Sequence, residues 1–287
     1  MHSPIAARLA LIAATVTWGT TFLITQNTLD AIDTYYLLGI RFSGAALLLF
    51  LLFHRSFARL DRALLRRGAM LGLILFAAYV LQTEALKRTS PGKVAFFSAV
   101  DCVAVPFLTW LVSQRRPTLL HVSAAFFCLG GIGCVSLEGN VTFSAGELLA
   151  LGCGILFGAH ILGLSRLAEG QPILPLTVVQ FGTTAALAWG FALLFNRPPA
   201  EIPLSAGLSL AYLCIFATAL AFICQTAGQR QMPPSTAALI LSLEAVFGVV
   251  CAMLFAHEPL TPMMCLGFAL IFAAILIAEL LPQRRKT

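Results

Sequence analysis

Long apolar segments follow one another along almost the whole chain, separated only by short polar turns. Ten of them are each about 20 residues long, the length a helix needs to cross the ~30 Å hydrocarbon core of a bilayer. Only 10% of the 287 residues are charged, against about 25% in soluble domains, so the chain lacks the polar side chains that a soluble fold of this size would expose. We therefore predict an all-α membrane protein with ten transmembrane helices in the lipid bilayer. Their ranges are 5–26, 33–53, 67–86, 91–112, 118–137, 144–164, 173–195, 203–226, 234–255 and 261–281.

Lysine and arginine are unevenly distributed between the two sides that this topology creates. With the N-terminus inside, 13 lie in inner segments, 4 lie in outer loops, and Arg41 lies within a span. Inner loops of membrane proteins carry an excess of these residues, which places both termini in the cytoplasm. The inner set is Arg8, Arg55, Arg59, Arg62, Arg66, Arg67, Arg115, Arg116, Arg166, Arg230, Arg284, Arg285 and Lys286, and the outer set is Lys87, Arg88, Lys93 and Arg197.

The two halves of the chain resemble each other weakly. Trp18-Gly19 matches Phe157-Gly158 at a shift of 139, and Pro91–Asp101 matches Pro234–Glu244 at a shift of 143. We expect one five-helix repeat in residues 1–139 and a second in 140–287. An odd number of helices per half forces opposite orientations, which predicts an inverted repeat and a basis for alternating access. An asymmetric bundle with accidental similarity is the alternative.

Several short motifs, taken in order, resemble a known family. Trp18–Phe22 and Arg41-Phe42 are similar to the first two helices of the EamA-type drug/metabolite transporter superfamily. Gly146–Leu151, Leu243–Phe247 and His257–Thr261 resemble motifs of its second half. The resemblance covers essentially the whole chain. It implies a central solute cavity and an exporter of small metabolites such as amino acids or drugs, in a bacterial inner membrane.

The chain departs from the family pattern at two places. Ala245 stands where proline is common, so the segment 234–255 lacks the residue that would kink it. Gln114–Pro117 stands where an acidic residue is common. Neither the resemblance nor these departures identify a substrate.

Two carboxylates are the first candidates for substrate binding or proton coupling. Asp101 and Glu244 each lie ten residues into a predicted span, which is about 15 Å along a helix and half of a ~30 Å core. They are also equivalent in the predicted repeat. Charges inside a bilayer cost about 2.5–3.5 kcal/mol on insertion scales, and a low dielectric favours a protonated carboxylic acid, which would suit proton coupling. The alternative is that each is hydrogen-bonded between helices in a structural role.

The remaining candidates are the other polar and aromatic residues of the spans. An arginine at position 41 can attract a substrate carboxylate or pair with a helical one, and Glu84 can line a gate or pair with the neighbouring Lys87 and Arg88. Gly154 and Gly158 have a GxxxG spacing, which predicts close helix packing. The further candidates for the solute site are Trp18, Arg41, Tyr79, Gln82, Glu84, His160 and Gln225.

Other classes of function lack the residues that they require. The five histidines are scattered, the eight cysteines form no CxxC pair, and neither HExxH nor GxSxG occurs, so we predict no metal, no cofactor and no enzyme. The absence of GxxxxGK[ST] excludes ATP hydrolysis by this chain, and no basic patch predicts nucleic-acid binding. The sequence favours a secondary transporter of a small-molecule solute. A passive channel or structural membrane subunit, or an intramembrane enzyme, remain alternatives, and the oligomeric state is not predicted.

Overall fold

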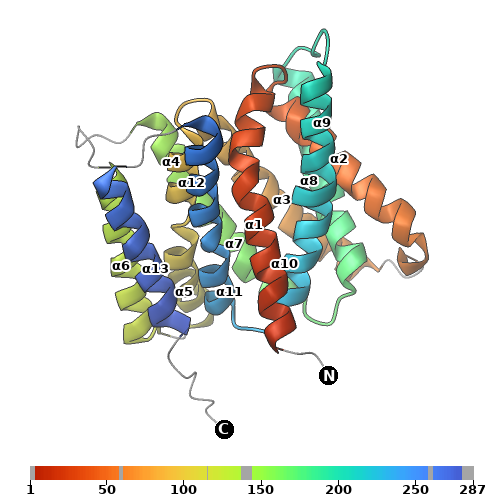
Figure 1. The fold of residues 1–287 in the computed structure, drawn as a ribbon. Helices are drawn as coiled ribbons and strands as arrows, with labels where there is room; N and C mark the ends of the chain where they lie inside the picture. Colours follow the sequence, from red (N-terminus) through yellow and green to blue (C-terminus); the bar gives the residue numbers. More distant parts are fainter. Residues whose placement is uncertain (1–3, 58–60, 115, 137–143, 258–260, 280–287) are drawn as a thin grey trace.

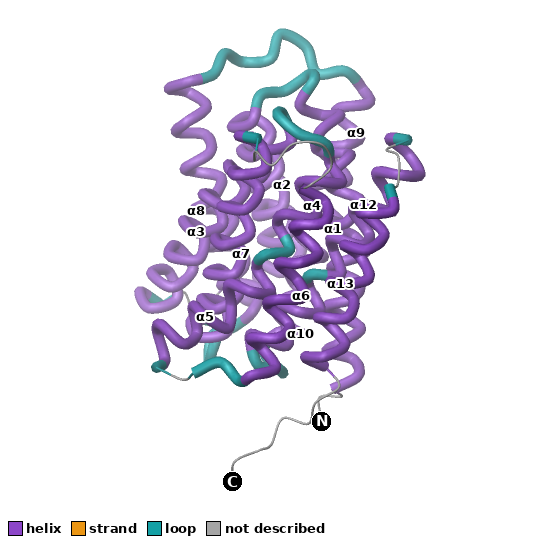
Figure 2. Tube along the Cα trace, turned by 90° about the vertical axis from the view of Figure 1, so that its left-hand side faces the viewer, coloured by secondary structure: helices purple, strands orange, loops and turns teal. Residues whose placement is uncertain are grey.

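The fold is that of a computed structural model, which describes residues 4–57, 61–114, 116–136, 144–257 and 261–279. Within these residues all regular secondary structure is helical. The helices form one bundle, with the connecting loops gathered at its two ends (Figure 1, Figure 2). α1 begins and α13 ends at the same end of this bundle (Figure 1).

The first half of the chain forms the helices α1 to α6. Asp61 caps α3 by accepting the Leu64 N–H at 2.6 Å, and Ser90 caps α4, whose first residue is Pro91. Proline is well placed there because the first helical N–H has no partner within the helix. The elements are α1 (Pro4–Leu29), α2 (Thr34–Phe53), the 3-10 turn η1 (His54–Phe57), α3 (Arg62–Leu86), α4 (Pro91–Ser98), α5 (Asp101–Ser113) and α6 (Leu119–Ser136).

The second half forms the helices α7 to α13. Ser144 and Glu147 make a reciprocal capping box at the start of α7, which satisfies two backbone N–H groups. The elements are α7 (Ala145–Leu167), α8 (Ile173–Phe195), α9 (Leu204–Tyr212), the π-helical segment η2 (Leu213–Leu220), α10 (Ala221–Gln229), α11 (Pro234–Leu241), α12 (Leu243–Ala256) and α13 (Pro262–Glu279).

Two of the predicted spans are not continuous helices. The range 91–112 is interrupted at Ala99 and Val100, and 234–255 is interrupted at Ser242 although it lacks a kinking proline. At both places the backbone makes tight i→i−3 hydrogen bonds, Ala99 N to Phe96 O at 3.2 Å and Ala245 N to Ser242 O at 3.1 Å. Each of these two spans therefore consists of two shorter helices, and both interruptions lie midway along the bundle (Figure 2).

Every one of the ten predicted segments contains helix, and eight helical segments within the described residues are long and apolar enough to cross a membrane. In this sense α4 with α5, α9 with η2 and α10, and α11 with α12 each count as one segment. α6 and α13 contain the shorter apolar stretches Val122–Gly131 and Pro262–Ala274.

The helices of the two halves interleave. α2 packs against α8, α3 packs against α7 and α8, and α1 packs against α10 and α12. α6 and α13 pack against each other at one side of the bundle (Figure 1). GxxxG packing is confirmed on α7: a Cβ added at Gly154 would lie 2.5 Å from the Ser98 carbonyl oxygen, and one at Gly158 would lie 3.1 Å from the Ala104 Cβ.

The outer surface of the bundle carries large apolar side chains. Exposed leucine and phenylalanine side chains occur on α2, α5, α6, α8 and α12, among them Leu51, Leu111, Phe126, Leu193 and Phe255. Apolar side chains of this size on every side suit a lipid surrounding, where all backbone polar groups must be satisfied within helices.

Candidate functional site

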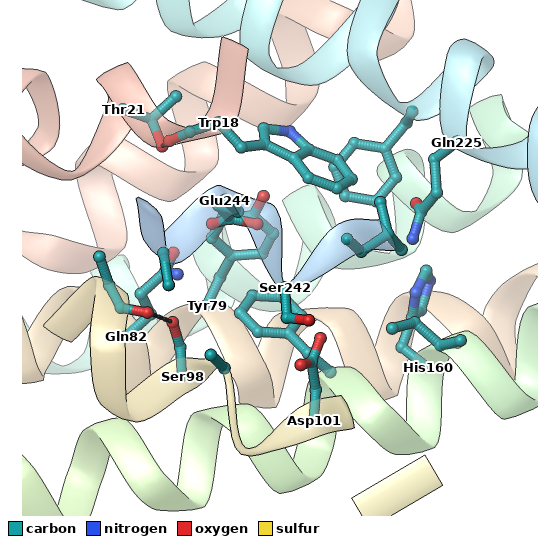
Figure 3. Close-up of a pocket in the computed structure, with 17 residues that line it drawn as sticks. Trp18, Thr21, Tyr79, Gln82, Ser98, Asp101, His160, Gln225, Ser242 and Glu244 are labelled. Carbon is teal, nitrogen blue, oxygen red and sulfur yellow. Dashed lines mark hydrogen bonds between the residues drawn. The ribbon is translucent and has the colours of Figure 1, made fainter. Parts of the chain in front are cut away.

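A buried cavity lies at the level of the two helix interruptions. It is lined by residues of α1, α3, α7 and α10 and of the two interrupted pairs α4–α5 and α11–α12 (Figure 3). The centres of water-sized molecules can occupy about 40 Å³ of it. Seven of the nine predicted site residues line this cavity: Trp18, Tyr79, Gln82, Asp101, His160, Gln225 and Glu244.

Asp101 is the first residue of α5 and directly follows the interruption after α4. Its side chain is 8% exposed, and its Oδ1 is buried without a hydrogen-bond partner among the described residues. The N-terminal end of a helix carries the positive end of its dipole, which stabilises a carboxylate. Asp101 therefore offers an acceptor to a ligand in the cavity.

Glu244 occupies the corresponding place on the other interrupted pair, as the second residue of α12. No hydrogen bond or ion pair within the described part of the chain engages its carboxylate. Asp101 and Arg41 are both near enough to interact with it electrostatically. Both carboxylates face the cavity, with Ser242 between them (Figure 3).

Arg41 does not line the cavity, although it is close to it. The residue is 1% exposed, its Nε donates to the Thr218 hydroxyl at 2.7 Å, and its Nη2 donates to the Tyr79 hydroxyl at 3.2 Å. The guanidinium also lies 4.6 Å from the centre of the Tyr79 ring, a cation–π distance. Tyr79, which lines the cavity, thus stands between Arg41 and any solute.

Trp18 forms part of the aromatic wall of the cavity. Its indole N–H donates to the Ala217 carbonyl at 2.7 Å, and its ring meets Phe222 edge-on at 5.1 Å. Ala217 lies in the π-helical segment, where the Ala221 N–H bonds to Phe216 instead of the Ala217 carbonyl that an α-helix would use. The altered hydrogen bonding therefore lets this carbonyl accept the indole.

His160 and Gln225 line the side of the cavity away from Gln82 and Ser98 (Figure 3). His160 Nε2 lies 3.1 Å from Gln180 Oε1 of α8, so the imidazole has a neutral amide partner. Gln225 Oε1 and Gln180 Nε2 are buried and lack a hydrogen-bond partner among the described residues. Of the two, only Gln225 lines the cavity, so its amide oxygen is available to a solute there.

Glu84 lies apart from the cavity, at the end of α3. It accepts the Thr34 hydroxyl at 2.5 Å and forms ion pairs with Lys87 at 3.3 Å and Arg88 at 3.0 Å. The structure thus places Glu84 in the local ion pairs that were its alternative interpretation. A separate ion pair, Lys93 to Glu147 at 3.1 Å, joins α4 to α7.

The candidate list missed cavity residues that the sequence shifts could have found. Phe157 is 139 positions from Trp18, and His160 is 139 positions from Thr21. Phe222 is 143 positions from Tyr79, and Gln225 is 143 positions from Gln82. The same shift separates Asp101 from Glu244. Applying both shifts to the chosen candidates would have added Thr21, Phe157 and Phe222.

Metal binding has no support in the described residues, which contain no cluster of three or more His, Cys, Asp or Glu side chains able to hold an ion. Cys102 and Cys128, both buried, place their Sγ atoms 3.1 Å apart, and all eight cysteines are free. The arrangement as a whole is a small, partly open cavity lined by two carboxylates, four aromatic side chains and several neutral polar groups.

Comparison with known proteins gives consistent results. The model of the EamA-like transporter family matches the chain twice, over residues 5–137 and 144–280. An uncharacterized transporter of Archaeoglobus fulgidus is 30% identical over 274 residues, which cover 96% of this chain and 86% of that protein. The uncharacterized transporter YwfM of Bacillus subtilis is 28% identical over 182 residues, covering 63% of this chain and 61% of its own. A solved crystal structure with 19% sequence identity shares the fold, with a TM-score of 0.79 over 99% of this chain and 100% of its own.

Proposed function

The chain belongs to the EamA-like transporter family and is a multi-pass membrane transporter, and from this premise we propose that the Asp101–Glu244 cavity is where it binds its solute. The observation that carries the proposal is the pairing of two carboxylates in one cavity. Each lies in the first turn of a half-helix, at an interruption midway along the bundle. Ionisable groups at such a depth are costly and usually mark a solute or proton pathway.

The proposal includes ten transmembrane helices arranged as two inverted repeats, residues 1–139 and 140–287. The double match of one family model supports it. So does the cavity lining, in which residues recur at shifts of 139 and 143. The only two non-glycine residues with positive φ in the described chain, Gln114 and His257, end α5 and α12 and are also 143 positions apart.

Alternating access follows from this arrangement. Two similar bundles around a shared central site can exchange inward-open and outward-open shapes. The ion pair between Lys93 and Glu147 spans the two proposed repeats and must open if they separate at that end. We further propose export across a bacterial cytoplasmic membrane, with both termini in the cytoplasm, driven by a proton or solute gradient.

Counterflow in proteoliposomes tests the proposal. Purified protein would be reconstituted into liposomes, and the vesicles would be loaded with defined sets of amino acids, amines or neutral metabolites, one set at a time. A secondary transporter gives saturable exchange for at least one set. Asp101→Asn and Glu244→Gln should each abolish it, because each removes a carboxylate while preserving the shape of the side chain.

The matched control is Glu201→Gln, which makes the same change at an exposed position before α9. It should leave exchange unchanged. Flux that never saturates would indicate a channel, and chemical conversion of a solute would indicate an enzyme. Unchanged exchange in both cavity variants would refute the assignment of the site.

A further inference from the structure

The charges around the cavity restrict the class of solute that can occupy it. Among the described residues that line it, Asp101 and Glu244 are the only Asp, Glu, Lys or Arg side chains, and Arg41 lies behind Tyr79. When both carboxylates are ionised, they and the guanidinium of Arg41 sum to a net charge of −1. The other titratable groups near the pair, all counted neutral, are Tyr79, Cys102, Cys153 and His160.

Arg41 is not available to bind a substrate carboxylate. Its Nε and Nη2 are engaged by Thr218 and Tyr79, and only 1% of the residue is exposed. A carboxylate entering the cavity would therefore meet two acidic groups and no accessible cation. This disfavours anions, and it disfavours zwitterionic amino acids because their carboxylate would lack a partner.

A single positive charge has the opposite effect. It brings the net charge of the site to zero, and uncompensated charge is expensive in a buried environment. The aromatic rings of Trp18, Tyr79, Phe157 and Phe222 also line the cavity, and aromatic faces attract cations. Asp101 Oδ1 supplies an unused acceptor for an ammonium N–H.

The size of the cavity limits the body of the ligand. The space open to the centres of water-sized molecules is about 40 Å³, so the part of the ligand inside the cavity must be small. The four aromatic side chains of the lining favour an apolar or aromatic body.

Resting on the proposed function, we propose that the solute is a small organic monocation, an amine with a compact apolar or aromatic body. Its ammonium group lies between Asp101 and Glu244, and its body lies among the aromatic side chains. Arg41 acts as a specificity-determining residue from behind Tyr79. Because its charge offsets one carboxylate, a ligand with one positive charge, rather than two, neutralises the site.

Four compounds with one phenyl-two-carbon skeleton test this directly. They are 2-phenylethylamine, a cation; phenylalanine, a zwitterion; 3-phenylpropionate, an anion; and 2-phenylethanol, which is neutral. Thermal stabilisation of the purified protein and counterflow in proteoliposomes would be measured for each. The amine should stabilise the protein and exchange, with at least about tenfold higher affinity than the other three.

Variants of the two carboxylates are compared by the ratio of their affinities for the amine and the alcohol. Asp101→Asn or Glu244→Gln brings the net charge of the empty site to zero, so the preference for the amine over the alcohol should fall by at least about tenfold. Because both affinities are measured on the same variant, a general loss of stability does not change this ratio. Glu201→Gln should keep the wild-type ratio.

Three results would overturn the inference: stronger binding of the zwitterion, anion or alcohol, no binding of the amine at millimolar concentration, or an unchanged ratio in both cavity variants. The outcomes also separate the two proposals. Saturable exchange of an amino acid or a neutral metabolite refutes the cation and retains the transporter site. Unsaturable flux of every compound refutes the transporter itself.

Discussion

Gly154→Ala is expected to destabilise the protein by crowding the place where α7 packs against the interruption between α4 and α5. The added Cβ would lie 2.5 Å from the Ser98 carbonyl oxygen and 2.6 Å from Val100 Cγ1, whereas ordinary contact begins at 3.4 Å. The interruption between α4 and α5 must therefore move away from α7 by about 0.9 Å. Overpacking of this kind costs about 1–3 kcal/mol of unfolding free energy. Because Asp101 directly follows the interruption, its carboxylate is displaced too.

The measurement is denaturant unfolding of the purified protein in mixed detergent micelles, together with counterflow of any transported solute. Gly182→Ala is the matched control, because no heavy atom lies within 4 Å of a Cβ added to this residue of α8. There alanine should be neutral, or stabilising by up to about 1 kcal/mol as a better helix former. Equal stability of the two variants would refute the packing argument.

Two further predictions concern buried hydrogen bonds near the cavity. Arg41→Lys should destabilise the protein by about 1–3 kcal/mol and lower transport, because a single ammonium cannot reproduce the guanidinium contacts with Thr218 and Tyr79. Denaturant unfolding would measure the first effect and counterflow the second. Trp18→Phe should lower the free energy of unfolding by about 1 kcal/mol, because it keeps a ring against Phe222 but leaves the Ala217 carbonyl without its indole donor. Unchanged stability in the same assay would contradict a stabilising role of this hydrogen bond.

Much of the helical layout was predictable because hydrophobicity dominates the sequence. The range 173–195 coincides with α8, and Pro91, Pro234 and Pro262 each begin a helix, where the missing N–H of proline costs least. The longest errors are at helix ends that continue past the apolar run. α1 extends to Leu29 and α3 begins at Arg62, because polar side chains at a membrane surface do not stop a helix.

Backbone irregularities were not predictable. Neither the segment 99–100 nor Ser242 contains glycine or proline, and the π-helical segment Leu213–Leu220 has no distinctive composition. Tertiary contacts accompany both kinds of irregularity: α7 places Gly154 against the first interruption, and Trp18 bonds to the π-helical carbonyl of Ala217. A sequence pattern indicates which residues favour a helix. It does not indicate which backbone carbonyl accepts a hydrogen bond from an indole that is distant in the sequence.

The candidate residues illustrate the same limit. Depth along a span brought Asp101 and Glu244 to one cavity, since distance from a helix start is a local property. Depth says nothing about which face of the helix a residue occupies. Arg41 lies within a predicted span yet stands behind Tyr79, and Glu84 lies outside the cavity in ion pairs with Lys87 and Arg88.

The interruptions and the carboxylates have a common physical explanation. A continuous helix would place Asp101 or Glu244 in its middle, where the peptide dipoles have no free end. Instead each carboxylate lies in the first turn of a half-helix, whose positive dipole end stabilises its negative charge. α4 and α11 end at the same level, so their negative ends meet the cavity from the other direction. Opposed half-helices of this kind stabilise the carboxylates through their positive ends and favour a cation between them through their negative ends.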